Sequence, residues 1–233
     1  SFYIIQPPTP ERVKYDIFDR VNRGGTRLTN QEMRNALYKG HSTVMLKDLA
    51  ASSVFLNATG RGISSKRMKD QYVILRSIAF YLLKKKQHEV LEQNGETIEY
   101  KSDIDDFLAK TMIFLNEKAS KELLEDCKNT FYRAMDNCYN VLGRDAFRFD
   151  SESGNRRPIN MPLFEVLMYV FSDNKLMEDV DYTKKEVENF KRKFDHQQMF
   201  SGNVDSTTNL NDRYDLAEEL IKQISDAIKT NNK

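Results

Sequence analysis

The apolar residues of this chain mostly follow the spacing of amphipathic helices. Val13, Ile17 and Val21 lie four residues apart, and the same kind of period recurs through most of the sequence. Capping residues, glycines and prolines separate these stretches. The pattern predicts helices over residues 9–23, 30–38, 42–55, 65–86, 102–115, 120–142, 161–171, 183–195 and 211–229. It predicts loops over residues 57–62, 143–160 and 201–211.

Strand-like character is limited to short segments. Residues 2–5 are aromatic and β-branched, whereas residues 97–100 and 147–149 are weaker candidates. A single strand needs a partner, so we expect residues 2–5 to be the remnant of an α/β core that lies upstream. The predicted fold class is therefore mainly α, with about eight or nine helices and one short N-terminal strand.

The composition is that of a soluble globular protein. Its 36 Lys and Arg against 35 Asp and Glu give a net charge of +1, so any contact with nucleic acid must come from local patches. Cys127 and Cys138 lie on one predicted helix, about 16 Å apart along its axis, and cannot form a disulfide with each other. With no signal peptide and no long apolar run, we expect no membrane partner and a cytoplasmic location.

Common catalytic and metal-binding patterns are missing from the sequence. The histidines, His41, His88 and His196, have no second His or Cys at ligand spacing, so no metal site is predicted. Asp195-His196 with Asn203 has only slight similarity to an HNH nuclease centre, which needs paired histidines and an asparagine. There is no Gly-x-Ser-x-Gly elbow and no Walker A loop.

One turn carries an unusual concentration of polar residues. In residues 18–35, two glycines join the end of one predicted helix to a capping box, Thr29-x-x-Glu32. Backbone amides in such a turn can form an anion-binding nest, and arginines can bind phosphate through two N–H groups. The candidate phosphate-binding residues are Arg20, Arg23, Gly24, Gly25, Thr26, Gln31 and Arg34. Alternatively, the turn is purely structural, with its arginines solvated or paired with carboxylates.

Other charged residues have simpler interpretations. Arg156 and Arg157 are candidate DNA contacts, as is the lysine run 84–86, although both could be solvated surface charges. Asp103, Asp105 and Asp106 are expected to favour a helix N-terminus rather than to act in catalysis. Arg76 lies near the apolar face of its predicted helix, and we expect it to pair with a carboxylate or to reach a polar site.

The turn also carries a family resemblance. Its sequence, Phe18-Asp-Arg-Val-Asn22-Arg-Gly-Gly-Thr-Arg-Leu-Thr-Asn-Gln-Glu32-Met-Arg-Asn-Ala-Leu, resembles the Phe-x-x-x-Asn motif of the GmrSD restriction-system N-terminal family. Weaker similarity lies in Arg67-Met68, in Leu75-Arg76, in residues 156–165 and in residues 207–213. Members of the GmrSD N-terminal family are ParB/sulfiredoxin-like NTPases of phage defence.

The resemblance implies an NTPase that uses GTP or ATP with a divalent cation and senses or cleaves modified foreign DNA. Residues 1–40 would be the edge of the ParB-like core, and residues 41–233 a helical subdomain. Asn22 would face the catalytic pocket. The family's Asp-Gly-Gln-Gln-Arg motif does not occur in these residues and is expected upstream, so we expect this fragment to be inactive alone, without bound nucleotide.

DNA and an HNH nuclease module are the implied partners of the parent protein, and its oligomeric state stays open. The alternative is a helical DNA- or protein-interaction module that performs no chemistry.

Overall fold

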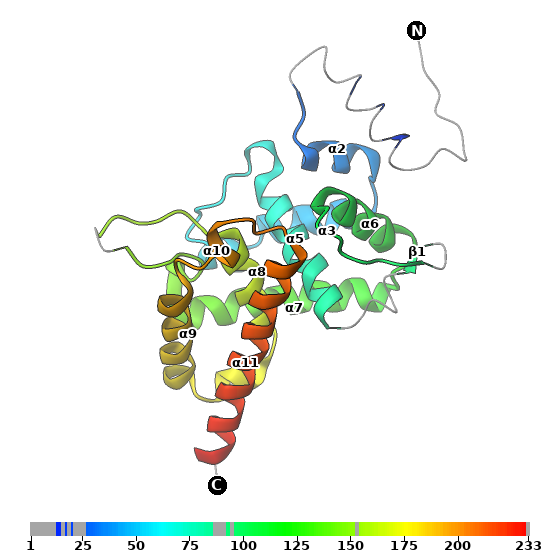
Figure 1. The fold of residues 1–233 in the computed structure, drawn as a ribbon. Helices are drawn as coiled ribbons and strands as arrows, with labels where there is room; N and C mark the ends of the chain where they lie inside the picture. Colours follow the sequence, from blue (N-terminus) through cyan, green and yellow to red (C-terminus); the bar gives the residue numbers. More distant parts are fainter. Residues whose placement is uncertain are drawn as a thin grey trace.

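The fold was analysed in a computed structural model. It describes Val13, Lys14, Ile17, Arg20 and residues 27–85, 92–93, 96–151 and 154–231. The prediction of a mainly α-helical fold is confirmed (Figure 1). The predicted strand at residues 2–5 and most of the first predicted helix lie outside the described residues, although Val13, Lys14, Ile17 and Arg20 are helical.

The described part contains ten α-helices and three short 3-10 helices. The α-helices are α2 (Asn30–Leu37), α3 (His41–Ala51), α4 (Ser53–Ala58), α5 (Lys69–Lys84), α6 (Ile104–Glu117), α7 (Lys121–Leu142), α8 (Met161–Val170), α9 (Val180–Phe194), α10 (Gln198–Ser201) and α11 (Thr207–Asn231). The 3-10 helices are η1 (Lys66–Met68), η3 (Gly143–Asp145) and η4 (Asn174–Glu178). Strands β1 (Glu92–Gln93) and β2 (Glu96–Thr97) form a minimal antiparallel pair.

The core is built around α5 and α8, which pack against each other. Every residue of α8 from Pro162 to Val170 is buried, so this helix is covered on all sides, as its nearly continuous apolar sequence requires. α4 packs on α7, and α11 packs on α8 and α9. In Figure 1, α2 lies at one end of the molecule, and α9 and α11 extend toward the other.

Two predicted helices are divided in the structure. The segment predicted as one helix over 42–55 breaks at Ser52, whose hydroxyl donates to the carbonyl of Leu49 and accepts the amide N–H of Phe55. One side chain thus ends α3 and caps α4. The helix predicted from residue 65 instead begins as η1, because Arg67 and Met68 adopt left-handed conformations (φ 60° and 56°), and α5 starts at Lys69.

Two predicted loops are more ordered than expected. The segment 143–160 is irregular, but it is not merely a surface loop, because Phe147 and Phe149 are buried. Phe147 packs against Phe164 of α8 with ring centroids 4.4 Å apart. The segment predicted as a polar loop over 201–211 holds the end of α10 and the start of α11, which begins at Thr207.

Candidate functional site

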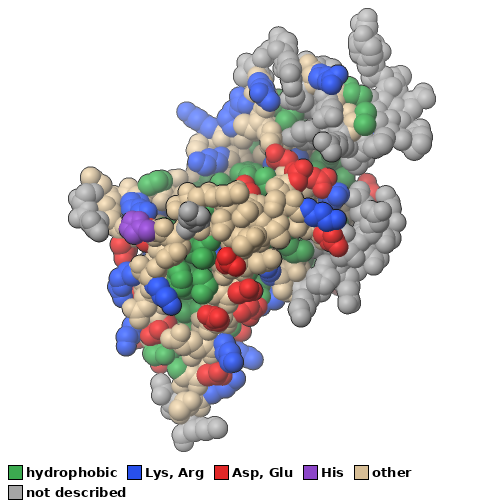
Figure 2. All heavy atoms as spheres, in the orientation of Figure 1, with side chains coloured by type: hydrophobic (Ala, Val, Ile, Leu, Met, Phe, Trp, Pro, Cys, Tyr) green, Lys and Arg blue, Asp and Glu red, His purple; other side chains and the backbone are tan. Residues whose placement is uncertain are grey.

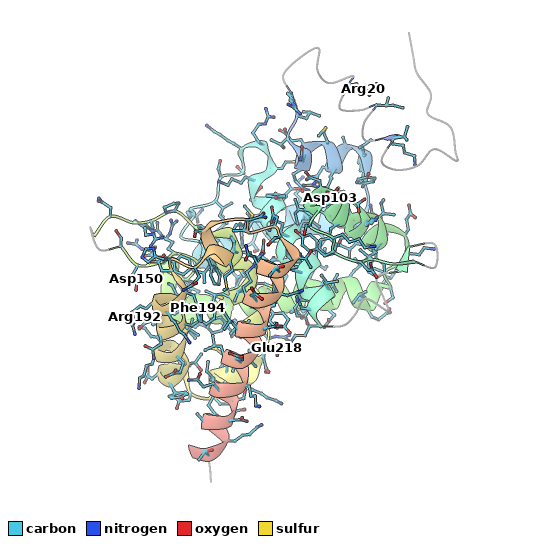
Figure 3. All side chains as sticks on the ribbon, viewed as in Figure 1. Arg20, Asp103, Asp150, Arg192, Phe194 and Glu218 are labelled. Atoms are coloured by element: carbon cyan, nitrogen blue, oxygen red, sulfur yellow. The ribbon has the colours of Figure 1, made fainter. Side chains whose placement is uncertain are left out.

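Most of the predicted phosphate-binding turn lies outside the described residues. This applies to Asn22, Arg23, Gly24, Gly25 and Thr26. Arg20 is described, exposed and helical, and Figure 3 places it beyond α2, at the end of the molecule away from α11. The description resumes at Arg27, just before α2 begins.

The N-terminus of α2 carries the predicted capping box. The hydroxyl of Thr29 accepts the amide N–H of Glu32 at 3.2 Å, and the carboxylate of Glu32 accepts the amide N–H of Thr29 at 2.7 Å. These reciprocal bonds satisfy two backbone donors that the first helical turn would otherwise leave without partners. The end of the turn is therefore fixed relative to α2.

Arg34 and Gln31 lie on the inner face of α2 and are buried. The Arg34 guanidinium donates to the Gln31 side-chain oxygen from Nε and Nη2. From Nη1 it donates to Asp105 at the start of α6, at 2.6 Å, and it lies over the Tyr72 ring. Asn30 also donates to Asp105. These bonds direct both predicted site residues toward α6 and hold α2 on the helical body.

A second segment packs against the start of α2. Arg67 of η1 donates to the carbonyl of Arg27 and forms an ion pair with Glu32, with an N–O distance of 3.1 Å. In return, the hydroxyl of Thr29 donates to the carbonyl of Arg67 at 3.1 Å. These contacts stabilise the left-handed conformation of Arg67, a conformation that costs a residue other than glycine about 1 kcal/mol or more.

This α2–η1 junction is basic on its solvent side. Arg27, Lys66, Arg67 and Lys69 are all exposed, and Figure 2 shows Lys and Arg side chains gathered over the α2 end of the molecule. The N-termini of α2 and α5 also meet here, and each carries the partial positive charge of a helix dipole. The junction therefore provides a positive potential directly after the predicted turn.

The predicted DNA contacts are paired within the protein. Arg156 Nε lies 2.5 Å from an Asp145 carboxylate oxygen, and Arg157 Nη1 lies 2.5 Å from one of Asp195. Of the lysine run, Lys84 donates to Asn211 and Lys85 lies over the Tyr169 ring, while residue 86 is not described. The lysines and the arginine pair thus contact different elements.

A buried ionic junction links three helices. Glu165 of α8 forms ion pairs with Arg76 of α5 and with Arg213 of α11, the latter at 3.1 Å, and all three are almost completely buried. Arg76 also donates to Asp205 at 2.8 Å, and Arg213 donates to the carbonyl of Val204. The prediction that Arg76 pairs with a carboxylate is confirmed.

The electrostatics of this junction favour its charged form. Burial alone would lower the pKa of Arg76. The charge and hydrogen bond of Glu165, together with Tyr72 and the hydrogen bond to Asp205, more than offset that effect, so the pKa is raised. Sequence reasoning missed the roles of Glu165 and Arg213. The available signal was Glu165 itself, the one acidic residue within the apolar run 161–171.

Known proteins offer no guide to the site. Comparisons with protein-family models, with curated proteins and with solved structures found no match. In the described ranges, no group of three or more His, Cys, Asp and Glu side chains is arranged to hold a metal ion. None of the helices described has both the length and the apolar character needed to cross a bilayer.

Proposed function

We propose that this chain is part of a nucleotide-dependent restriction protein that senses or cleaves modified foreign DNA. In this proposal, residues 18–26 form one half of a GTP or ATP site, and Asn22 faces the reacting nucleotide. The observation that carries it is the α2–η1 junction, where exposed basic residues meet directly after the turn that resembles the family motif.

Charge supports this assignment. A nucleoside triphosphate with one divalent cation keeps a net negative charge, so it is attracted by Arg20, Arg27, Lys66 and Lys69, while Arg67 is paired with Glu32. The amides of the Gly24-Gly25 turn would add donors of the kind that hold phosphates in other nucleotide sites. The divalent cation would be bound chiefly through the nucleotide's own phosphates, as is usual for Mg²⁺.

The α2 helix has a positioning role in this proposal. Arg34 is turned inward to Asp105 and Gln31 accepts from Arg34, so both would act by fixing the end of the turn rather than by touching phosphate. The remaining half of the site, Asp-Gly-Gln-Gln-Arg in the resembling family, would come from another segment. DNA and an HNH nuclease module remain the proposed partners.

Hydrolysis by the protein that includes the Asp-Gly-Gln-Gln-Arg segment tests the role of Asn22. GTP and ATP turnover would be measured with Mg²⁺ present. We expect Asn22→Ala to lower kcat by about a hundredfold or more, as the loss of a preorganised polar group at a reacting centre does. Asn140→Ala, an exposed position on α7, serves as the matched control. Unchanged turnover in Asn22→Ala would contradict the proposal.

A second measurement tests the basic junction separately. Lys66→Gln combined with Lys69→Gln should raise the KM for the nucleotide about tenfold and leave kcat nearly unchanged. The reason is that both lysines would stabilise the bound nucleotide and the transition state equally. The effect should shrink as salt is added. A KM that does not move would remove the junction from the nucleotide site.

A further inference from the structure

A second group of arginines gathers around one carboxylate. We define the Asp145 cluster as Arg144, Asp145, Arg148 and Arg156, which lie at and beyond the end of α7. Three guanidinium groups surround the Asp145 carboxylate, with N–O distances of 3.9 Å for Arg144, 3.3 Å for Arg148 and 2.5 Å for Arg156. One carboxylate cannot balance three cations, so the cluster has an excess of positive charge.

Further acids do not remove this excess. Asp195 forms its ion pair with Arg157, and Asp150, which Figure 3 shows near Arg192 at the end of α9, acts electrostatically on Lys191. Lys191 is itself buried and adds another cation near Asp145. Burial lowers the pKa of Lys191, and the nearby Asp150, Glu188 and Asp145 carboxylates oppose that effect without cancelling it.

Arg148 is the most enclosed member of the cluster. Only 8% of the residue is exposed, and its Nε is buried without a hydrogen-bond partner, although Asp145 lies 3.3 Å away outside bonding geometry. Its Nη1 donates to the carbonyl of Arg157. Burial and the neighbouring Arg156 lower the pKa of Arg148. A buried guanidinium with an unused donor is costly unless an acceptor completes it.

The loop 60–62 fixes the positions of these guanidinium groups. A Cβ atom at Gly60 would collide with Arg156 Nη2, and one at Gly62 would collide with Arg148 Nη2. Gly60 also has a left-handed conformation (φ 56°), which favours glycine. The two glycines therefore allow the arginine side chains to press against the loop. A prearranged set of donors loses little entropy when it binds a ligand.

We propose that the Asp145 cluster binds a phosphate group. The largely exposed Arg144 provides a forked pair of N–H donors from the solvent side. Arg156 donates to Asp145 from Nε and to the carbonyl of Arg144 from Nη2, so a phosphate must take Nη1 or displace Asp145. Arg148 provides fixed positive charge from below. Guanidinium forks match phosphate oxygens, and clusters of arginines are a recurring means of phosphate recognition. Asp145 acts as the internal counter-ion in the absence of the ligand and competes with it. This site does not depend on Asn22 or on nucleotide hydrolysis.

Opposite effects of two substitutions test the proposal. Binding of inorganic phosphate, and separately of a short DNA duplex, would be measured by calorimetry at low salt. Asp145→Asn removes the competing charge and should tighten binding about tenfold, whereas Arg156→Gln should weaken it about tenfold. Arg144→Gln, which reaches no buried group, should weaken it less and guards against a folding defect in Arg156→Gln. The matched controls are Asp136→Asn on α7 and Arg192→Gln on α9, both exposed.

Each outcome has a defined meaning. If phosphate binds with this pattern and the duplex does not, the site takes a small phosphate ligand. If the duplex binds with the same pattern, the phosphate group belongs to a nucleic acid backbone. Absence of saturable binding by both ligands, or equal losses in Arg156→Gln and Arg192→Gln, would overturn the proposal.

Discussion

The buried ionic junction and the Asp145 cluster both consist of arginines and carboxylates, but they have different roles. In the buried junction, Arg76 and Arg213 share Glu165, and Asp205 supplies a second carboxylate. Two positive charges thus meet two negative charges, of which Glu165 is fully buried and Asp205 lies partly exposed at the edge of the core. In the Asp145 cluster, three arginines share one half-exposed carboxylate.

The difference shows how burial and charge balance together decide the role of an arginine. A buried ion pair must be matched, because an unpaired charge in the core costs several kcal/mol. Its main effect is then to fix which helices meet, here α5, α8 and α11. At the surface, water tolerates an excess of charge, so the solvent-facing arginines of the cluster, Arg144 and Arg156, remain available to an anion.

The largest effect is expected at Glu165. Glu165→Gln keeps the size of the side chain but leaves Arg213 with carbonyl partners only and Arg76 with Asp205. The free energy of unfolding should fall by about 3–5 kcal/mol, the usual result of breaking a buried ion pair from one side. Urea denaturation measures this, with Glu219→Gln on the exposed face of α11 as the control. A loss below about 1 kcal/mol would mean that the junction does not hold the core together.

An intermediate effect is expected at Arg34, whose buried guanidinium pairs with the partly exposed carboxylate of Asp105. Arg34→Met removes the bonds to Gln31 and Asp105, but Asp105 remains accessible to water because 39% of its side chain is exposed. The free energy of unfolding should fall by about 2 kcal/mol, less than at Glu165. Hydrogen exchange should show faster opening of α2 than of α5. Equal protection of both helices would contradict the anchoring role of Arg34.

The smallest effect on stability is expected within the Asp145 cluster. Arg144→Gln removes a side chain that is 75% exposed and lies 3.9 Å from its carboxylate. Thermal unfolding in buffer without phosphate should therefore change by less than about 0.5 kcal/mol, as for most surface ion pairs. A larger loss would place the Asp145 cluster with the structural junctions and would weaken its contrast with the buried one.

The sequence predicted local features well where local bonds decide them. The capping box at Thr29 and Glu32 and the start of α7 after Ser120 are such cases, since the bonds lie within one helical turn. The pairing of Arg76 with a carboxylate also followed from its place on an apolar helix face. The break at Ser52 was missed because apolar residues before it, Leu49 and Ala50, and after it, Val54 and Phe55, continue the helical period.

The sequence identified the segment that carries the candidate site, but not the tertiary contacts of its side chains. Nothing in residues 30–35 indicates that Arg34 turns inward, because its partner Asp105 is 71 residues away in the chain. The same holds for the contact of Arg67 with Arg27, which places η1 beside the turn.

By itself, the sequence determined the helical class, most helix positions and the capping box at Thr29, since periodicity and capping are short-range properties of a chain. Only the tertiary structure decided which charges are buried, which are shared and which remain in excess. Whether an arginine is paired or left in excess depends on which carboxylates the packing places near it. Packing placed Glu165 between Arg76 and Arg213, and it placed a single Asp145 among three arginines.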